Sequence, residues 1–301
     1  MSRPLVSIVT TSYNQAAYLE ETIESVLGQD YDPLEYLVID DGSTDGSVEI
    51  LRRYGHRLAW WEVQENQGQA AALNRAFEHA TGNVLSFLSS DDTLLPGTVS
   101  RVVEVFTKDP HLLAVYGDVW LTDERSRRVE RGVSGEWDPG KMARRAYGVF
   151  QPGMFFTRRA WENAGPFNER SWGLFDIEFA LRIAAAGRAQ YVPEPLATFR
   201  LHPDSKQLSR HREMAEEHLR FAREFYEAGA FPAALRRHVR TGRANLYRRA
   251  ALRYQAAGET GDARRLFLRS LLLSPVGLTG KQLRRLAPTL VRRPFRQGRQ
   301  H

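Results

Sequence analysis

The chain has no cysteine among its 301 residues. A disulfide framework, a thiolate zinc site and a cysteine nucleophile are therefore excluded, and the absence fits a reducing compartment. Long apolar runs are also missing, since no stretch reaches the roughly 18 apolar residues of a membrane-spanning helix. The opening residues, MSRPLVSIVTTSYN, do not read as a signal peptide because their short apolar run leads at once into polar residues. These absences predict a soluble, cytoplasmic protein.

Several catalytic signatures are absent as well. The first expected strand is not followed by G-x-G-x-x-G, and no G-x-x-x-x-G-K-[ST] occurs anywhere, which argues against a dinucleotide dehydrogenase and a P-loop phosphotransferase. The chain also lacks G-x-S-x-G and H-E-x-x-H, the signatures of α/β-hydrolases and of zinc proteases.

Acidic residues are scarce in the last third of the chain. Residues 206–301 carry 22 Lys and Arg against 7 Asp and Glu, whereas residues 1–205 carry 20 against 29. The formal charge of +6 is therefore the sum of +15 in the C-terminal part and −9 in the rest. Such a division predicts an ordinary folded body with a basic extension that meets an anionic partner.

Short apolar, β-branched runs alternate with segments whose apolar residues recur at helical spacing. Strands are expected at residues 5–10, 36–39, 58–63, 84–88 and 114–120, and helices at 17–27, 47–54, 69–80 and 96–108. Alternation of this kind predicts the α/β class, with βαβ units and a mostly parallel sheet flanked by helices. Further strands are expected at 154–156 and 196–199, a hairpin or mobile loop at 122–141, and a helix at 177–186.

Polar residues follow four of the expected strands. They are Thr11 to Asn14, Asp40 and Asp41, Glu65 and Asn66, and Asp91 and Asp92. Because ligands of parallel α/β sheets bind beyond the carboxyl ends of the strands, we expect these residues to converge at one edge. Carboxylates gathered with amides and hydroxyls indicate a hydrated cation and a polar ligand.

Five segments together resemble a known family. The first segment, residues 6–51, is VSIVTTSYNQAAYLEETIESVLGQDYDPLEYLVIDDGSTDGSVEIL, and it is followed by ENQGQAAALNRAF, GNVLSFLSSDDTLLPG, FDIEFALR and FRLHPDS. In content and order these segments resemble the family 2 glycosyltransferases, over about residues 4–206. The resemblance implies a GT-A (Rossmann-like) fold and an inverting transfer of a sugar from a UDP-, GDP- or dTDP-linked donor to a hydroxyl of a glycan or lipid-linked acceptor. It also implies a Mn²⁺ or Mg²⁺ cofactor and a role in the biosynthesis of cell-surface polysaccharide or glycan.

The resemblance also assigns donor-site residues. It implies that Asp92 is a metal ligand and that Asp91 contacts the ribose or a metal-bound water. The alternative for both is a loop in which Asp caps the next helix.

Thr11, Tyr13 and Asp41 are expected to line the nucleotide pocket by the same resemblance, with Tyr13 against the base. Asn66 and Gly68 open the third loop of the donor site. The alternatives are an aromatic residue packed on the sheet for Tyr13 and a simple turn for Asp41.

Asp176 is the expected catalytic base, because deprotonation of an acceptor hydroxyl requires a carboxylate that faces it. The family segment carries an acidic pair, of which Phe175 replaces the first member, and the alternative for Asp176 is a helix cap. By the same resemblance His202 is expected to bind the metal or the leaving phosphate, and Arg200 to contact the diphosphate. The alternative for His202 is an ordinary surface histidine beside Pro203. Leu73 stands where many relatives carry an arginine.

The sequence predicts two domains. Residues 1–206 form the catalytic domain, with a nucleotide-binding half at about 1–120 and an acceptor half at about 121–206. Residues 207–301 form a basic helical extension in which residues 246–275 resemble one tetratricopeptide hairpin. Basic and apolar residues interleave from Arg264 onward, which fits either a helix lying on an anionic membrane or a solvated face packed on the hairpin. An alternative to catalysis is a nucleotide-sugar-binding or scaffold protein that acts through this extension, and no specific nucleic-acid partner is expected.

Overall fold

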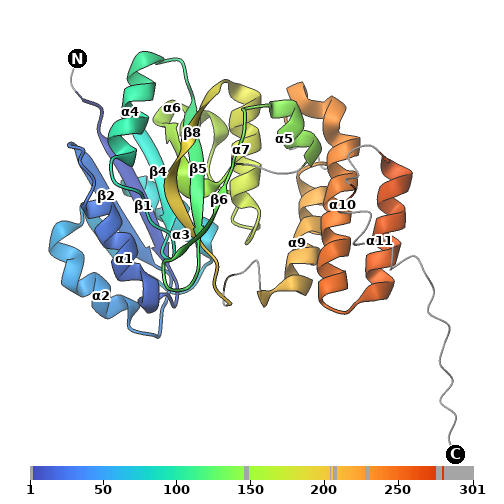
Figure 1. Cartoon of the computed structure of the whole chain (residues 1–301), viewed down its shortest axis with the longest axis horizontal. Helices are drawn as coiled ribbons and strands as arrows, with labels where there is room; N and C mark the ends of the chain where they lie inside the picture. The colour runs from blue at the N-terminus through green and yellow to red at the C-terminus, as the bar shows by residue number, and fades with distance from the viewer. Residues whose placement is uncertain are drawn as a thin grey trace, which may run out of the picture. The chain divides into compact units, whose positions relative to one another are not determined.

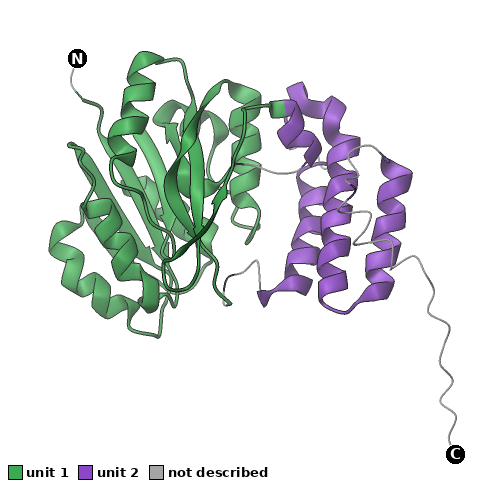
Figure 2. Ribbon diagram, in the orientation of Figure 1, with its two compact units in different colours: residues 1–139, 147–205 green, residues 140–146, 206–301 purple. Residues whose placement is uncertain are grey.

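The computed structural model describes residues 3–145, 149–203, 205, 209–227, 231–275 and 280. The chain forms two compact units, coloured separately in Figure 2. Unit 1 contains residues 1–139 and 147–205, and unit 2 contains residues 140–146 and 206–301. The segment 140–146 thus groups with the C-terminal helices, a feature that the predicted division at residue 206 does not include.

Unit 1 is built around one mixed β-sheet (Figure 1). Its strands run in the order β3 (Trp60–Val63), β2 (Leu34–Asp40), β1 (Val6–Ser12), β4 (Val84–Ser89), β7 (Met154–Thr157), β5 (Ala114–Thr122) and β6 (Arg128–Gly132), and β8 (Ala189–Arg200) pairs with β5. The four strands from β3 to β4 are parallel, as the sequence predicts. Strand β7 lies between β4 and β5 and is antiparallel to both. Strand β5 is therefore not paired with β4, although the two run in the same direction.

Helices cover both faces of this sheet. They are α1 (Ala16–Leu27), α2 (Ser47–Tyr54), α3 (Gln69–His79), α4 (Thr98–Lys108), α6 (Arg158–Ala164) and α7 (Phe175–Ala186), with short 3₁₀ turns at Gly55–Arg57 and Gln151–Gly153. Apolar residues of α1, α2 and α4 share one core cluster with Ile8, whereas those of α3, α6 and α7 share the other with Val9. Neighbouring residues of β1 serve opposite cores because side chains alternate across a strand. A strand buried on both faces has the continuous apolar run seen in LVSIV.

Unit 2 is helical in its described part. It contains α5 (Pro139–Arg145, whose first residue belongs to unit 1), α9 (His211–Glu224), the 3₁₀ segment η3 (Ala233–His238), α10 (Val239–Ala256) and α11 (Thr260–Leu273). Helix α10 packs against both α9 and α11. Tyr226 Oη donates to the carbonyl of Ala143 (2.8 Å) and Asn245 Nδ2 to that of Arg144 (2.7 Å), which explains why 140–146 belongs to this unit.

Helices α10 and α11 form a hairpin over the segment that resembles a tetratricopeptide repeat. Tyr254, Ala263 and Phe267, at the motif spacings, are buried. In the described residues, no helix is both long and apolar enough to cross a membrane. The basic segment 283–296 lies outside the described residues.

Candidate active site

The loops that follow the parallel strands meet at one edge of the sheet, as predicted. The backbone N–H of Asp41, after β2, donates to the carbonyl of Ser12 at the end of β1 (2.8 Å). Gln69 Nε2, at the start of α3, lies within hydrogen-bond distance of the hydroxyls of Thr11 (3.3 Å) and Ser89 (3.2 Å). The ends of β1, β2 and β4 and the start of α3 are therefore joined by direct hydrogen bonds.

Asp41 organises the loop between β3 and α3. Its Oδ1 accepts from Gln64 Nε2 (2.7 Å) and from the N–H of Gln67 (2.9 Å), and its Oδ2 accepts from the N–H of Gly68 (2.9 Å). Gly68 adopts φ +91°, a conformation that glycine reaches without strain. The buried Asp41 carboxylate thus shapes the loop that carries the exposed Asn66.

Thr11 and Tyr13, at the end of β1, differ in exposure. Thr11 is buried, whereas Tyr13 is 47% exposed. The next residue, Asn14, has φ +53°, and its Oδ1 accepts the N–H of Thr44 (2.8 Å). That hydrogen bond holds the turn after β1, in which Tyr13 is exposed at the edge of the sheet.

Asp91 and Asp92 have different environments. Asp92 is buried, and its Oδ1 accepts the backbone N–H of Arg200 (2.9 Å), which ties the end of β4 to β8. Burial, followed by the adjacent Asp91 carboxylate, raises the pKa of Asp92 well above its usual range. The Asp91 side chain is 21% exposed, and its Oδ2 lies 3.1 Å from His202 Nε2.

His202 is buried, and its other ring nitrogen, Nδ1, has no hydrogen-bond partner. The ring lies 5.0 Å from that of Tyr18 on α1. A buried polar atom without a partner is costly unless a ligand satisfies it. The structure thus brings together His202 and Asp91, two of the predicted site residues, but pairs Asp91 rather than Asp92 with the imidazole.

Arg200 is held inside the protein by several side chains and carbonyls. It is 2% exposed, and its Nε donates to the carbonyl of Asp91 (2.8 Å), its Nη1 to Ser126 Oγ (2.8 Å) and its Nη2 to Glu21 Oε2 (2.7 Å). The guanidinium also lies 4.7 Å from the Tyr18 ring centroid. The expected diphosphate contact of Arg200 stays a prediction; in this structure every nitrogen of the side chain bonds to protein, and Arg200 clamps the Asp91 loop.

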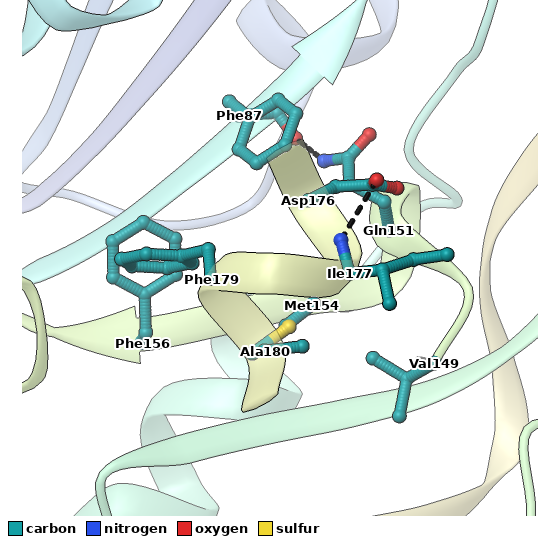
Figure 3. Close-up of a pocket in the computed structure, with 9 residues that line it drawn as sticks. All are labelled: Phe87, Val149, Gln151, Met154, Phe156, Asp176, Ile177, Phe179 and Ala180. Carbon is teal, nitrogen blue, oxygen red and sulfur yellow. Dashed lines mark hydrogen bonds between the residues drawn. The ribbon is translucent and has the colours of Figure 1, made fainter. Parts of the chain in front are cut away.

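Asp176 lies in the first turn of α7, and its Oδ1 accepts the N–H of Ile177 (2.8 Å). It lines a small cavity of about 10 Å³, room for about one water molecule, whose other walls are mainly apolar (Figure 3). Gln151 also lines this cavity and donates through Nε2 to the carbonyl of Phe87 on the neighbouring strand. Asp176 therefore contacts its own helix N-terminus and a largely apolar cavity.

The described residues at this edge of the sheet do not form a dense cluster of metal-binding side chains. In the described part of the chain, no group of three or more His, Cys, Asp or Glu side chains is arranged to hold a cation. Asp40 is not available, because both of its carboxylate oxygens accept hydrogen bonds from Ser43. Of the acidic residues expected to converge, Asp91 alone lies beside an imidazole.

Sequence reasoning missed the residues that support this site. Glu21 and Tyr18 lie three residues apart on α1, and both contact Arg200. Because this spacing occurs on every helix face, it gave no sequence signal for their role. Asn74 donates to the carbonyl of Phe167 (2.9 Å) and so joins α3 to the loop before α7. Leu73, at the position of the missing arginine, is fully buried in the core.

Comparison with known proteins identifies the family. Residues 7–162 match glycosyl transferase family 2. An uncharacterized glycosyltransferase of Nostoc sp. is 30% identical over 216 residues, which cover 68% of this chain and 67% of the relative. Chondroitin synthase of Escherichia coli is 28% identical over 223 residues, covering 73% of this chain but 32% of the synthase, so the chain spans about a third of that relative.

Solved structures show the same fold. Residues 1–349 of S. aureus TarS, in complex with UDP-GlcNAc, align with a TM-score of 0.62 at 16% identity, covering 89% of this chain and 91% of that one. The mannosyltransferase PcManGT of Pyrobaculum calidifontis, in complex with GDP-Man and Mn²⁺, aligns with a TM-score of 0.62 at 23% identity, covering 96% and 85%. The chain therefore belongs to glycosyl transferase family 2 and has the GT-A fold.

Proposed function

We propose that this glycosyltransferase moves a sugar from a nucleoside diphosphate donor to an acceptor hydroxyl, with inversion, in the biosynthesis of a cell-surface polysaccharide or glycan. The observation that carries the proposal is the Asp91–His202 pair, which joins the residues after β4 and β8, with β4 lying next to β1 in the sheet. The named relatives are consistent with it, since they include a chondroitin synthase, and the two structural neighbours were solved with nucleotide sugars.

A divalent cation, Mn²⁺ or Mg²⁺, would be held by Asp91 and His202. Their facing atoms are 3.1 Å apart, close to the roughly 3 Å that separates two donors in one coordination shell. When bound, the cation would neutralise charge on the leaving diphosphate. Asp92 would instead anchor β4 to β8, which reverses the roles expected from the resemblance.

The exposed ring of Tyr13 supplies a flat face for the base, and Thr11 a hydroxyl close to it. Asn66 and Gly68 lie on the loop that Asp41 holds in place, so Asp41 acts on the donor through that loop. These residues do not distinguish one base from another, so UDP, GDP and dTDP are all candidate nucleotides of the sugar donor.

Asp176 would accept the proton of the acceptor hydroxyl. The hydrogen bond from Ile177 orients its carboxylate, and the apolar walls of the adjoining cavity exclude bulk water. One carboxylate that removes this proton suffices for direct displacement at the anomeric carbon, which inverts its configuration.

Matched variants of the two adjacent aspartates test the donor site. Thermal unfolding would be measured with UDP-, GDP- and dTDP-sugars, with and without Mn²⁺ or Mg²⁺. A donor at about 100 times its dissociation constant adds about 2.7 kcal/mol to the free energy of unfolding. We expect metal-dependent stabilisation by one nucleotide class that Asp91→Asn abolishes. Asp92→Asn should lower the starting stability and retain the response.

Two results would count against this assignment. Loss of the response in Asp92→Asn together with its retention in Asp91→Asn would mean that Asp92, and not Asp91, binds the metal, as the resemblance implies. Stabilisation without any turnover, measured as release of the nucleoside diphosphate in the presence of candidate acceptors, would favour a binding protein over an enzyme.

A further inference from the structure

Unit 2 contains a basic cavity that sugar transfer does not use. It has a volume of about 330 Å³ and is lined by residues of α9, α10 and α11. Arg223, Arg265 and Arg269 contribute three guanidinium groups, and Tyr247 and Leu266 contribute apolar surface. The Arg269 guanidinium lies 4.9 Å from the centroid of the Tyr247 ring, which holds it at the wall of the cavity.

The charge of this cavity is positive after its acidic neighbours are counted. Glu227 also lines it, but Glu227 forms an ion pair with Arg243. Asp262 pairs with Arg265 (2.8 Å) at an exposed position, where such a pair contributes little. Guanidinium groups are suited to phosphate oxygens, which they bind through paired hydrogen bonds.

An exposed apolar stripe lies next to the cavity on the same helix. Leu268 is 42% exposed and Leu272 is 82% exposed, the highest value among the large apolar side chains that are exposed in the described residues. At about 100° per residue, Arg265, Leu268, Arg269 and Leu272 fall within an arc of about 100°. That arc is opposite the buried face of α11, which contains Leu266 and Phe267.

We propose that this face of unit 2 docks on a membrane surface rich in anionic phospholipids. The arginines of the cavity bind lipid phosphates, and Leu268 and Leu272 enter the boundary between headgroups and acyl chains. The net charge of +15 on residues 206–301 complements such a surface. Docking of this kind would hold the enzyme beside a membrane-borne acceptor, a role separate from the transfer reaction itself.

Co-sedimentation of the full chain with vesicles tests the proposal. We expect binding to phosphatidylcholine vesicles that contain phosphatidylglycerol, weakening with added salt, and little binding to phosphatidylcholine alone. Arg223→Gln with Arg269→Gln should weaken binding about 25-fold, about fivefold for each arginine. Leu272→Ser should weaken it about tenfold.

Matched controls lie in unit 1. Arg52→Gln with Arg53→Gln makes the same charge change at exposed positions, and Val129→Ser replaces an apolar side chain that is 63% exposed. Both controls should bind as the parent does, and unfolding curves would verify that all variants fold. Equal binding to both vesicle types, equal loss in the controls, or unchanged binding in the unit 2 variants would overturn the proposal.

Discussion

Replacement of Arg200 by methionine tests whether one buried guanidinium holds the donor loop in place. Arg200 donates to the carbonyl of Asp91, to Ser126 and to Glu21, and it is 2% exposed. Methionine fills a similar volume with no donor. The Arg200→Met variant therefore leaves the carbonyl of Asp91 without this hydrogen bond in a buried position.

The expected cost follows from this environment. Removing one partner of a buried, hydrogen-bonded ion pair costs about 3–5 kcal/mol. Glu21 is 48% exposed and can recover hydration, so we expect the lower end, about 3 kcal/mol. Glu21→Gln retains an acceptor for the guanidinium and should cost about 1 kcal/mol.

Tryptophan fluorescence in urea measures this cost for unit 1 alone. All six tryptophans, at positions 60, 61, 120, 137, 161 and 172, belong to unit 1. Arg101→Met is the matched control, because Arg101 is 41% exposed in its side chain and its ion pairs with Glu104 and Glu194 lie at the surface. We expect the control to change the free energy of unfolding by less than about 1 kcal/mol.

Equal stabilities of Arg200→Met and Arg101→Met would refute the clamp. A second measurement distinguishes support of the site from general stability. Folded Arg200→Met should bind Mn²⁺ more weakly than Arg101→Met, because Arg200 fixes the backbone of Asp91.

Three further predictions concern the base, the fold of unit 2 and the donor loop. Asp176→Asn should abolish transfer and leave donor binding intact; equal turnover by this variant, measured by nucleoside diphosphate release, would remove Asp176 as the base. Burial, followed by the charge of nearby Arg249, lowers the pKa of His218 to about 3. Since the unfolded histidine has a pKa of about 6.5 and binds more protons below it, unit 2 should lose stability as the pH falls below 6.5, by about 2 kcal/mol at pH 5. Helical circular dichroism would detect the loss, and His218→Leu should reduce its pH dependence. Gly42→Ala places a methyl 3.1 Å from the backbone nitrogen of Asn66 at φ +84°, whereas Gly68→Ala at φ +91° meets no atom within 4 Å. Both should cost about 1 kcal/mol or more from strain, and urea titration should find Gly42→Ala the worse.

Much of unit 1 follows from local patterns. The helix predicted at residues 47–54 is α2 with the same bounds, and the strand predicted at 84–88 is β4 with one more residue. The continuous apolar run at the start of the chain correctly indicates a strand buried on both faces. The order β4–β7–β5 was not predicted, because residues 154–157 are distant in sequence from both neighbours and their own pattern does not specify a partner.

The sequence by itself predicted most strands and helices of unit 1 and the edge of the sheet at which we place the site. Apolar periodicity distinguishes helix from strand, and in a parallel sheet the strand ends that carry Thr11, Asp41 and Asp91 must face the same way. Only the tertiary structure decided what each side chain does there. Arg200 is a clamp because α1 brings Glu21 against it, and Asp91 rather than Asp92 meets His202 because β8 covers Asp92. The physical reason is that burial and hydrogen-bond partners depend on elements far apart in the chain, which no local pattern records.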